Sequence, residues 1–197
     1  MLVHHATLKK YERNLMGLYQ NAEVSDHVAG ITWYKEANEY ANKLSNMFNV
    51  SLDKVCQVMA ILSPAASWEK NKLSAFYMLK AYSENSAYDS FKVTTYGANK
   101  KKAWEVLTLN KTIPSTGLKV YSFYRNILNP NIADTVTIDR HAIKAMKGID
   151  KAGKQAVTSL TYRKASFVYT RMASRLGIKP HEFQAIVWLA YKRRVGR

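Results

Sequence analysis

The sequence predicts an all-α fold, and three observations support this prediction. Apolar residues recur at spacings of three and four along most of the 197-residue chain, which is typical of the buried face of a helix. Residues that start and stop helices flank these runs. The β-branched stretch from Phe91 to Thr95 is too short to predict a sheet. We therefore expect one domain, residues 1–197, of nine or ten helices.

The flanking residues set the order and limits of these helices. Ser51 and Ser67 are expected N-caps, because a serine hydroxyl can accept a hydrogen bond from a first-turn amide. Pro64 stops one helix, Gly177 ends another, and Pro180 opens the last. The periodic runs cover residues 8–18, 32–48, 51–62, 67–80, 99–107, 117–128, 138–146, 161–176 and 180–193.

The charge balance indicates an anionic partner. The chain has 30 Lys and Arg against 14 Asp and Glu, a formal net charge of +16. Such an excess predicts affinity for a polyanion, with nucleic acid as the first candidate and an anionic membrane surface as the second. No apolar run approaches the ~20 residues that span a bilayer. The N-terminus also lacks the order of a signal peptide. We therefore expect a cytoplasmic protein with no membrane partner.

Cys56 is the single cysteine of the chain. One cysteine excludes an intramolecular disulfide and any zinc or iron–sulfur centre held by several cysteines. Its neighbours Val55, Val58 and Met59 are apolar, which favours a buried structural thiol over a nucleophile. The sequence indicates no cofactor and no metal site.

A possible phosphate site and a possible nucleophile lie at Pro114 to Lys119. A short turn before a helix can present backbone N–H groups, and these groups together with the helix dipole bind phosphate. Lys119 is expected in the first turn of that helix. There the positive end of the dipole disfavours a protonated amine, and an unprotonated lysine attacks electrophilic carbon. The alternative is a surface turn with a solvated lysine.

A possible catalytic carboxylate follows at Asp139. Thr137 is expected to cap the next helix, which would place Asp139 in the first turn, where the dipole favours a carboxylate. The alternative is an aspartate that only stabilises the helix. Arg140 and His141 come next and are further candidates for the site. His141 has no companion ligands at metal spacing, so a structural hydrogen-bonding role is its alternative.

Five short motifs occur in a fixed order along the chain. They are Leu62-Ser63 before Pro64-Ala65-Ala66, then Asn71-Lys72, Gly97 to Lys102, Ile113 to Lys119, and Ile138 to His141. In order and separation they resemble the helix-hairpin-helix DNA glycosylase superfamily, in its endonuclease III-like group. The resemblance implies a glycosylase-like helical fold with a helix-hairpin-helix element and two packed helical lobes. The hairpin-containing lobe would cover about residues 60–146, and the N- and C-terminal helices would form the other lobe.

The resemblance also implies roles for single residues. Lys119 matches the family's catalytic lysine, and Asp139 matches its catalytic aspartate. Ser115, Thr116 and Gly117 match the hairpin that grips a phosphate, although Ser115 stands where the family has glycine. Around the wedge loop, Ser63 matches the motif, but no glutamine follows it to fill the space left by a flipped base. Trp68 could act as the wedge instead, or could belong to the core. The family's cysteine-ligated iron–sulfur cluster is absent.

Nearly the whole chain also resembles a group of small, poorly characterised bacteriophage proteins. The matching stretches are residues 30–34, 62–71, 136–142 and 183–188. These proteins resemble distant members of the same superfamily. Related phage enzymes are implicated in thymine hypermodification, in which an amino acid or amine replaces a leaving group on an activated base.

Three functions are therefore open at this stage. The first is a DNA glycosylase, with or without lyase activity, that excises a damaged or modified base flipped out of double-stranded DNA. The second is a base-hypermodification transferase on the same scaffold. The third is a DNA-binding module without catalysis.

Other residues give weaker signals. Lys100, Lys101 and Lys102 are expected either to contact phosphates or to form a solvated face. Tyr121 lies near Lys119 on one predicted helix and could line a pocket. Trp188 falls on an apolar helical stripe, which predicts a core position rather than base stacking.

Overall fold

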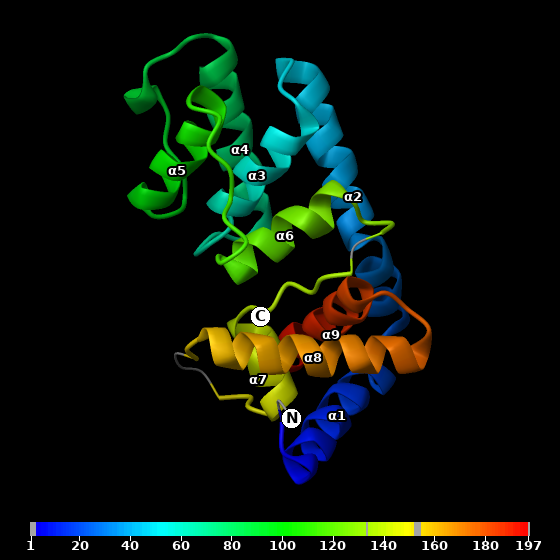
Figure 1. The fold of residues 1–197 in the computed structure, drawn as a ribbon. Helices are drawn as coiled ribbons and strands as arrows, with labels where there is room; N and C mark the ends of the chain where they lie inside the picture. Colours follow the sequence, from blue (N-terminus) through cyan, green and yellow to red (C-terminus); the bar gives the residue numbers. More distant parts are fainter. Residues whose placement is uncertain (1–2, 133, 152–154, 197) are drawn as a thin grey trace. The chain divides into compact units, whose positions relative to one another are not determined.

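The computed structural model describes residues 3–132, 134–151 and 155–196, and all regular structure within these ranges is helical (Figure 1). The all-α prediction is confirmed. The helices are α1 (His5–Gln20), α2 (Val24–Phe48), α3 (Leu52–Leu62), α4 (Trp68–Ser83), α5 (Gly97–Thr108), α6 (Leu118–Leu128), α7 (Arg140–Lys147), α8 (Ser159–Leu176) and α9 (Pro180–Arg194), with a 3-10 turn, η1 (Tyr88–Ser90), before α5.

The chain divides into two compact units. Unit 1 comprises Met1–Lys35 and Asn131–Arg197, and unit 2 comprises Glu36–Pro130. These limits differ from the lobe predicted at about residues 60–146. Unit 2 begins inside α2, where a continuous helical pattern gives no boundary signal. In addition, α7 belongs with the terminal helices because it packs against α1, α8 and α9.

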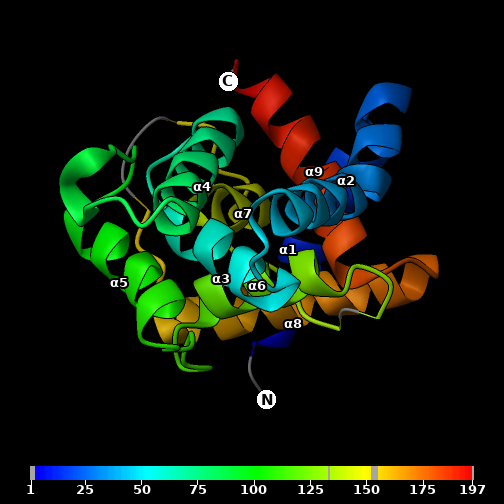
Figure 2. The same ribbon diagram turned by 90° about the horizontal axis from the view of Figure 1, so that it is seen from above.

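The core of unit 2 is built on α3. Its residues 55–62 are all buried, which is the pattern of a helix that is apolar on every side. Figure 2 shows α3 with α4, α5 and α6 around it, and α3 packs against each of these helices. The one long polar side chain in this run, Gln57, is satisfied: its amide donates to Asp53 (2.6 Å) and its carbonyl accepts from the Ile113 N–H (3.0 Å).

The core of unit 1 is built on α9. Residues 181–187 of this helix are all buried, and α9 packs against α1, α7 and α8. The N-terminal part of α2 also approaches it closely at Gly30. A Cβ added to Gly30 would lie 2.6 Å from the backbone nitrogen and 2.7 Å from the Cα of Ile186. Only glycine leaves room for this contact between the two helices.

Most helix ends follow the predicted residues. Ser51 and Ser67 accept hydrogen bonds from first-turn amides of α3 and α4, and Gly177 ends α8 in the left-handed conformation with φ 67°. The start of α2 was predicted wrongly, since the helix begins at Val24 rather than at residue 32. Its first two turns carry large apolar side chains that face solvent, Val24 at 80% and Val28 at 59% exposure, so they produce no amphipathic pattern to predict from.

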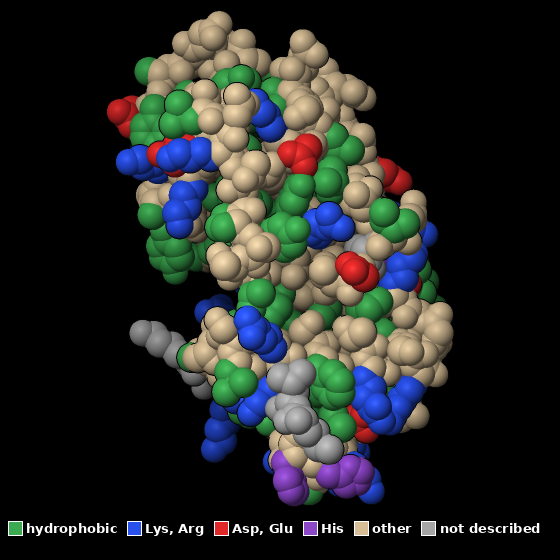
Figure 3. All heavy atoms as spheres, viewed as in Figure 1, with side chains coloured by type: hydrophobic (Ala, Val, Ile, Leu, Met, Phe, Trp, Pro, Cys, Tyr) green, Lys and Arg blue, Asp and Glu red, His purple; other side chains and the backbone are tan. Residues whose placement is uncertain are grey.

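Positive charge is unevenly divided between the units. Unit 1 holds 18 Lys and Arg against 7 Asp and Glu, an excess of 11, whereas unit 2 holds 12 against 7. On the face drawn in Figure 3, Lys and Arg side chains outnumber the acidic ones. Within the described ranges, no helix combines the length and apolar character needed to cross a membrane.

The close approach at Gly30 gives a first testable prediction. Gly30→Ala should lower the free energy of unfolding of unit 1 by about 1–3 kcal/mol, because the new methyl group meets backbone rather than a flexible side chain. Gly17→Ala is the matched control, since Gly17 also lies in a helix but a Cβ there meets nothing within 4 Å. That change should raise stability by about 0.5–1 kcal/mol. Urea unfolding followed by circular dichroism measures both changes, and equal effects would contradict the packing.

Burial of Cys56 gives a second prediction. Burial, with a smaller contribution from Asp53, raises the pKa of the Cys56 thiol to about 12. The native protein at about pH 8 should therefore react slowly with a thiol reagent, and the urea-unfolded chain should react quickly. The raised pKa means that the folded chain holds the thiol proton more tightly than the unfolded chain does. The contribution of the protonated thiol to folding stability is therefore complete below about pH 9 and is lost as the pH rises toward 12. Cys56→Ala should remove that part of the alkaline destabilisation. Fast labelling of the native thiol would refute the buried placement.

Candidate functional site

Lys119 lies in the first turn of α6 in unit 2, as predicted. The turn before it is closed by a hydrogen bond from the Gly117 N–H to the Pro114 carbonyl (3.0 Å). Gly117 is the N-cap of α6 and supplies no side-chain acceptor. The α6 N-terminus therefore differs from those of α3, α4, α7 and α8, where a side chain accepts from a first-turn amide. As at α1 and α5, whose N-caps also lack a side-chain hydrogen bond, the first amides of α6 can receive an acceptor from outside the chain.

The turn needs no glycine at Ser115. None of Ser115, Thr116 and Gly117 has a positive φ, so a serine fits where the family pattern has glycine. The connection is longer than a short hairpin, however, because α5 ends at Thr108 and α6 begins at Leu118. The extra length reflects the end of α5, after which Asn110 turns the chain with φ 52°. The prediction of a short turn between these two helices is therefore wrong.

Asp139 lies at the start of α7 in unit 1 and is the N-cap itself. Its Oδ1 accepts from the Ala142 N–H (2.7 Å), so the prediction that Thr137 caps this helix and that Asp139 lies in its first turn is wrong. Thr137 is buried before the helix begins. The α7 backbone is also held from α8, where Tyr169 donates to the Ala142 carbonyl (3.0 Å). Burial, then the charge of Asp139 and the nearby Tyr191, raises the pKa of Tyr169 well above its ordinary value.

The second oxygen of Asp139 accepts from a residue that the sequence did not mark. The indole Nε1 of Trp188 on α9 donates to Oδ2 at 3.3 Å, so both carboxylate oxygens are held by neutral N–H donors. Trp188 was predicted to be a core residue, but it is only partly buried. The ammonium group of Lys192 lies over the Trp188 ring, 4.2 Å from the ring centroid. The sequence could not indicate this pairing, because Asp139 and Trp188 are 49 positions apart.

Asp139 is unusual among the acidic residues of unit 1. Five of the seven are in ion pairs within the unit: Glu12, Glu23, Asp26, Asp150 and Glu182. Asp139 forms no ion pair with any residue that the structure describes. Arg140, the next residue in the sequence, donates to the His141 ring at 3.4 Å, and Lys192 lies over the ring of Trp188, the residue that donates to Asp139. A half-buried carboxylate is thus fixed in position and left without a countercharge in the more basic unit.

The wedge-loop candidates have structural partners in unit 2. Ser63 caps the end of α3 and donates to the Ala60 carbonyl (2.9 Å). Trp68 opens α4, and its ring lies edge-on to Phe123 with 6.5 Å between centroids. These contacts fix the loop, and both side chains remain partly accessible.

The three consecutive lysines are not equivalent. Lys100 donates to the carbonyls of Tyr88 (2.8 Å) and Phe91 (2.7 Å), and its ammonium group lies over both rings. It therefore anchors η1, and the prediction that it contacts phosphate or belongs to a solvated face is wrong. Lys101 and Lys102 are exposed and form no ion pair with described residues. They remain candidates for phosphate contact. Tyr121 is partly buried beside Tyr124, with ring centroids 6.0 Å apart.

The candidates form two groups. Unit 2 holds Lys119 with the turn before it, and unit 1 holds Asp139 with Arg140, His141, Trp188 and Lys192. Trp188 was not predicted for the second group, because its place on an apolar helical stripe indicated the core. Within the described ranges, no three His, Cys, Asp or Glu side chains gather into a metal-binding group.

Comparison with known proteins gives a family without an assigned activity. The family described as "Family of unknown function (DUF7178)" matches residues 2–195. No curated protein and no solved structure matches the chain.

The capping geometry gives a third prediction. Asp139→Ala should lower the stability of unit 1 by about 1 kcal/mol, because it removes the acceptor for the Ala142 N–H. Asp139→Asn keeps an oxygen at the cap and should stay within about 0.5 kcal/mol of the parent chain. Urea unfolding of the two variants measures the difference. Identical stabilities would mean that the cap does not form in solution.

Proposed function

We propose that this chain, which belongs to the DUF7178 family of unknown function, is a DNA-acting enzyme that cleaves the glycosidic bond of a flipped nucleotide in double-stranded DNA. The observation that carries the proposal is the Asp139 carboxylate, which is fixed by two N–H donors and has no ion-pair partner among the described residues. A structural aspartate in so basic a unit would gain from a cationic partner. A carboxylate without one is suited to stabilise positive charge that develops on a substrate.

Binding of the polyanion is assigned to the cations and to the α6 N-terminus. The formal net charge of +16 supplies long-range attraction to the phosphate backbone. The first-turn amides of α6, together with Thr116 and Lys119, supply a local phosphate contact. Lys101 and Lys102 supply further sequence-independent contacts.

The chemical step divides between the two candidate residues. As the bond between C1′ and the base breaks, positive charge develops at the sugar, and the Asp139 carboxylate stabilises it. The base leaves with the electron pair, a water molecule adds to C1′, and a proton of that water passes to the released base. For the lyase form, the neutral Lys119 amine bonds to C1′ as the bond to the base breaks, and one amine proton passes to the departing base. The C1′–O4′ bond then breaks, O4′ takes the second amine proton, and C1′ becomes the carbon of a Schiff base. That imine permits elimination of the 3′ phosphate and strand cleavage.

Borohydride trapping gives the fourth prediction. Duplexes that contain uracil, oxidised or hypermodified bases should release free base, and the parent protein should become covalently trapped on reduction of the imine. Lys119→Ala should abolish trapping. Asp139→Asn should slow base release by about 10²–10³-fold, in line with the loss of one preorganised charge-stabilising group. Lys43→Ala, at an exposed lysine of the same unit for which no DNA contact is proposed, is the matched control and should be trapped normally.

Other outcomes identify the alternatives. Intact glycosidic bonds with a heavier base, after incubation with activated thymine derivatives and amino acids, would replace the glycosylase with a transferase. If Lys119→Ala and Asp139→Asn change only DNA affinity, the protein is a non-catalytic binding module. In that case the slope of log K against log salt should fall by about 0.9 for each phosphate contact removed.

A further inference from the structure

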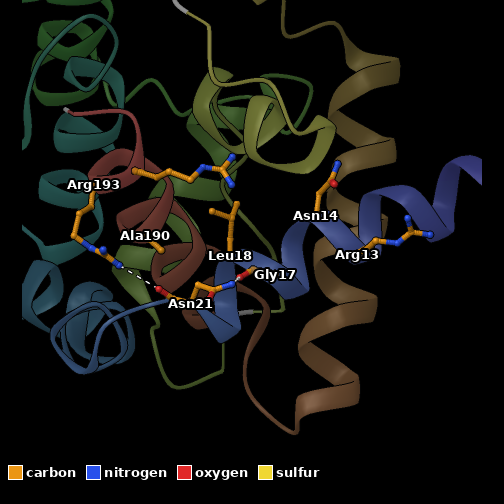
Figure 4. Close-up of a pocket in the computed structure, with 8 residues that line it drawn as sticks. Arg13, Asn14, Gly17, Leu18, Asn21, Ala190 and Arg193 are labelled. Carbon is orange, nitrogen blue, oxygen red and sulfur yellow. Dashed lines mark hydrogen bonds between the residues drawn. The ribbon is translucent and has the colours of Figure 1, made fainter.

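A concave site that none of this chemistry uses lies in unit 1, between one face of α1 and the C-terminal end of α9 (Figure 4). The pocket has a volume of ≈ 480 Å³, within the range of small-molecule sites. Its polar lining is Arg13, Asn14, Asn21, Arg193 and Arg194. Gly17, Leu18 and Ala190 complete it with small or apolar groups. Arginine is the only charged residue type in the lining.

The polar groups of the pocket are held in place. Asn14 donates to the Met146 carbonyl (3.0 Å), and Asn21 donates to the Gly17 carbonyl (2.7 Å). At one end, Arg193 donates to the Asn21 carbonyl (3.4 Å), as Figure 4 shows. In the same view Arg13 marks the other end of the α1 face, and its side chain points outward. Positions 13, 14, 17, 18 and 21 share one face of the helix because they follow its repeat.

The three guanidinium groups differ in their present partners. Arg193 is paired with Glu23 (2.9 Å) and with the buried Asp26 (2.7 Å). Arg194 pairs with Asp150, and both of these side chains are about half exposed, so the pair contributes little and can exchange for another anion. Arg13 is exposed and forms no ion pair with any residue that the structure describes. Two of the three arginines can therefore turn to a ligand without loss of a buried pair.

Gly17 has no packing reason to be glycine. It lies well inside α1, where glycine destabilises a helix relative to alanine. A Cβ at Gly30 would collide with the Ile186 backbone, whereas a Cβ at Gly17 would meet nothing within 4 Å. Its φ is not positive. The space in front of Gly17 is the pocket itself, so a ligand that approaches the helix backbone would account for the missing side chain.

We propose that this pocket binds a small organic phosphate of nucleotide size. Guanidinium groups match the geometry of phosphate oxygens and favour them over uncharged ligands. Leu18, Ala190 and the open space at Gly17 supply an apolar wall for the rest of the molecule. The assignment does not depend on the proposed DNA chemistry, because it uses neither Lys119 nor Asp139.

Titration calorimetry with adenosine diphosphate, inorganic phosphate and adenosine gives the fifth prediction. The diphosphate should bind, phosphate should bind more weakly, and adenosine should not bind. The double variant Arg13→Gln/Arg194→Gln should weaken the diphosphate by about tenfold or more, as expected for lost charged hydrogen bonds. Gly17→Leu should block the pocket while α1 stays folded, since leucine favours helices and the added side chain meets no protein atom at its Cβ. Arg163→Gln/Lys164→Gln, the same charge change on α8, should bind normally.

The outcomes separate the ligand sources and decide the assignment. An oligonucleotide with a 5′ phosphate is compared with its 5′ hydroxyl form. If the 5′ phosphate raises the affinity, and Arg13→Gln/Arg194→Gln removes that increase, the phosphate comes from a DNA end and the pocket assignment stands. Absence of binding by every phosphate probe at millimolar concentration overturns it. So does diphosphate binding that Gly17→Leu leaves unchanged, or that the α8 control weakens equally, in protein shown by circular dichroism to be folded.

Discussion

Each unit of this protein depends on one helix that contains a continuous run of buried residues, 55–62 in unit 2 and 181–187 in unit 1. A helix satisfies its own backbone hydrogen bonds, so it can be enclosed by others provided that its side chains are apolar or individually paired. In unit 2 this helix is α3. Its buried polar residue Gln57 meets this condition, because both the nitrogen and the oxygen of its side-chain amide are hydrogen-bonded. In unit 1 it is α9. The candidate residues are positioned from these two helices: the segment before Lys119 is held by Gln57, and Asp139 is held by Trp188.

The two candidate catalytic residues lie at helix N-termini that differ in whether the chain itself supplies an acceptor for the first amides. At α7 the positive end of the dipole is met by a carboxylate from the chain itself, so Asp139 is both a structural cap and the proposed charge-stabilising group. At α6 the cap is Gly117, which has no side chain, and the amides are left for an external acceptor. A capped N-terminus positions a protein group, whereas an uncapped one can position a phosphate. The same element of structure can therefore serve chemistry in one unit and binding in the other.

Local features of the fold could be predicted from the sequence, and features that depend on tertiary contacts could not. Ser51, Ser67 and Gly177 act through neighbouring backbone groups, and their roles as helix ends were predicted correctly. The start of α2 was missed because Val24 and Val28 expose their side chains, which removes the periodic signal. The cap of α7 was predicted two residues too early, at Thr137 rather than at Asp139, because both residue types are common N-caps. The unit boundary inside α2, and the arginine pocket, arise from contacts between segments more than 100 residues apart.

The charges of unit 1 place a condition on how DNA could be bound there. Its excess of 11 positive charges attracts a polyanion from any direction, and most of its carboxylates are already neutralised by internal pairs. Asp139 is the described exception that is also fixed by hydrogen bonds, so it would repel any phosphate brought directly against it. In the proposed complex, binding is favoured by an orientation that sends the phosphates to the arginines and lysines and turns a sugar toward the carboxylate. That orientation is the one in which glycosidic bond cleavage would be assisted, so in the proposed reaction the carboxylate that lowers general affinity for DNA selects the productive pose.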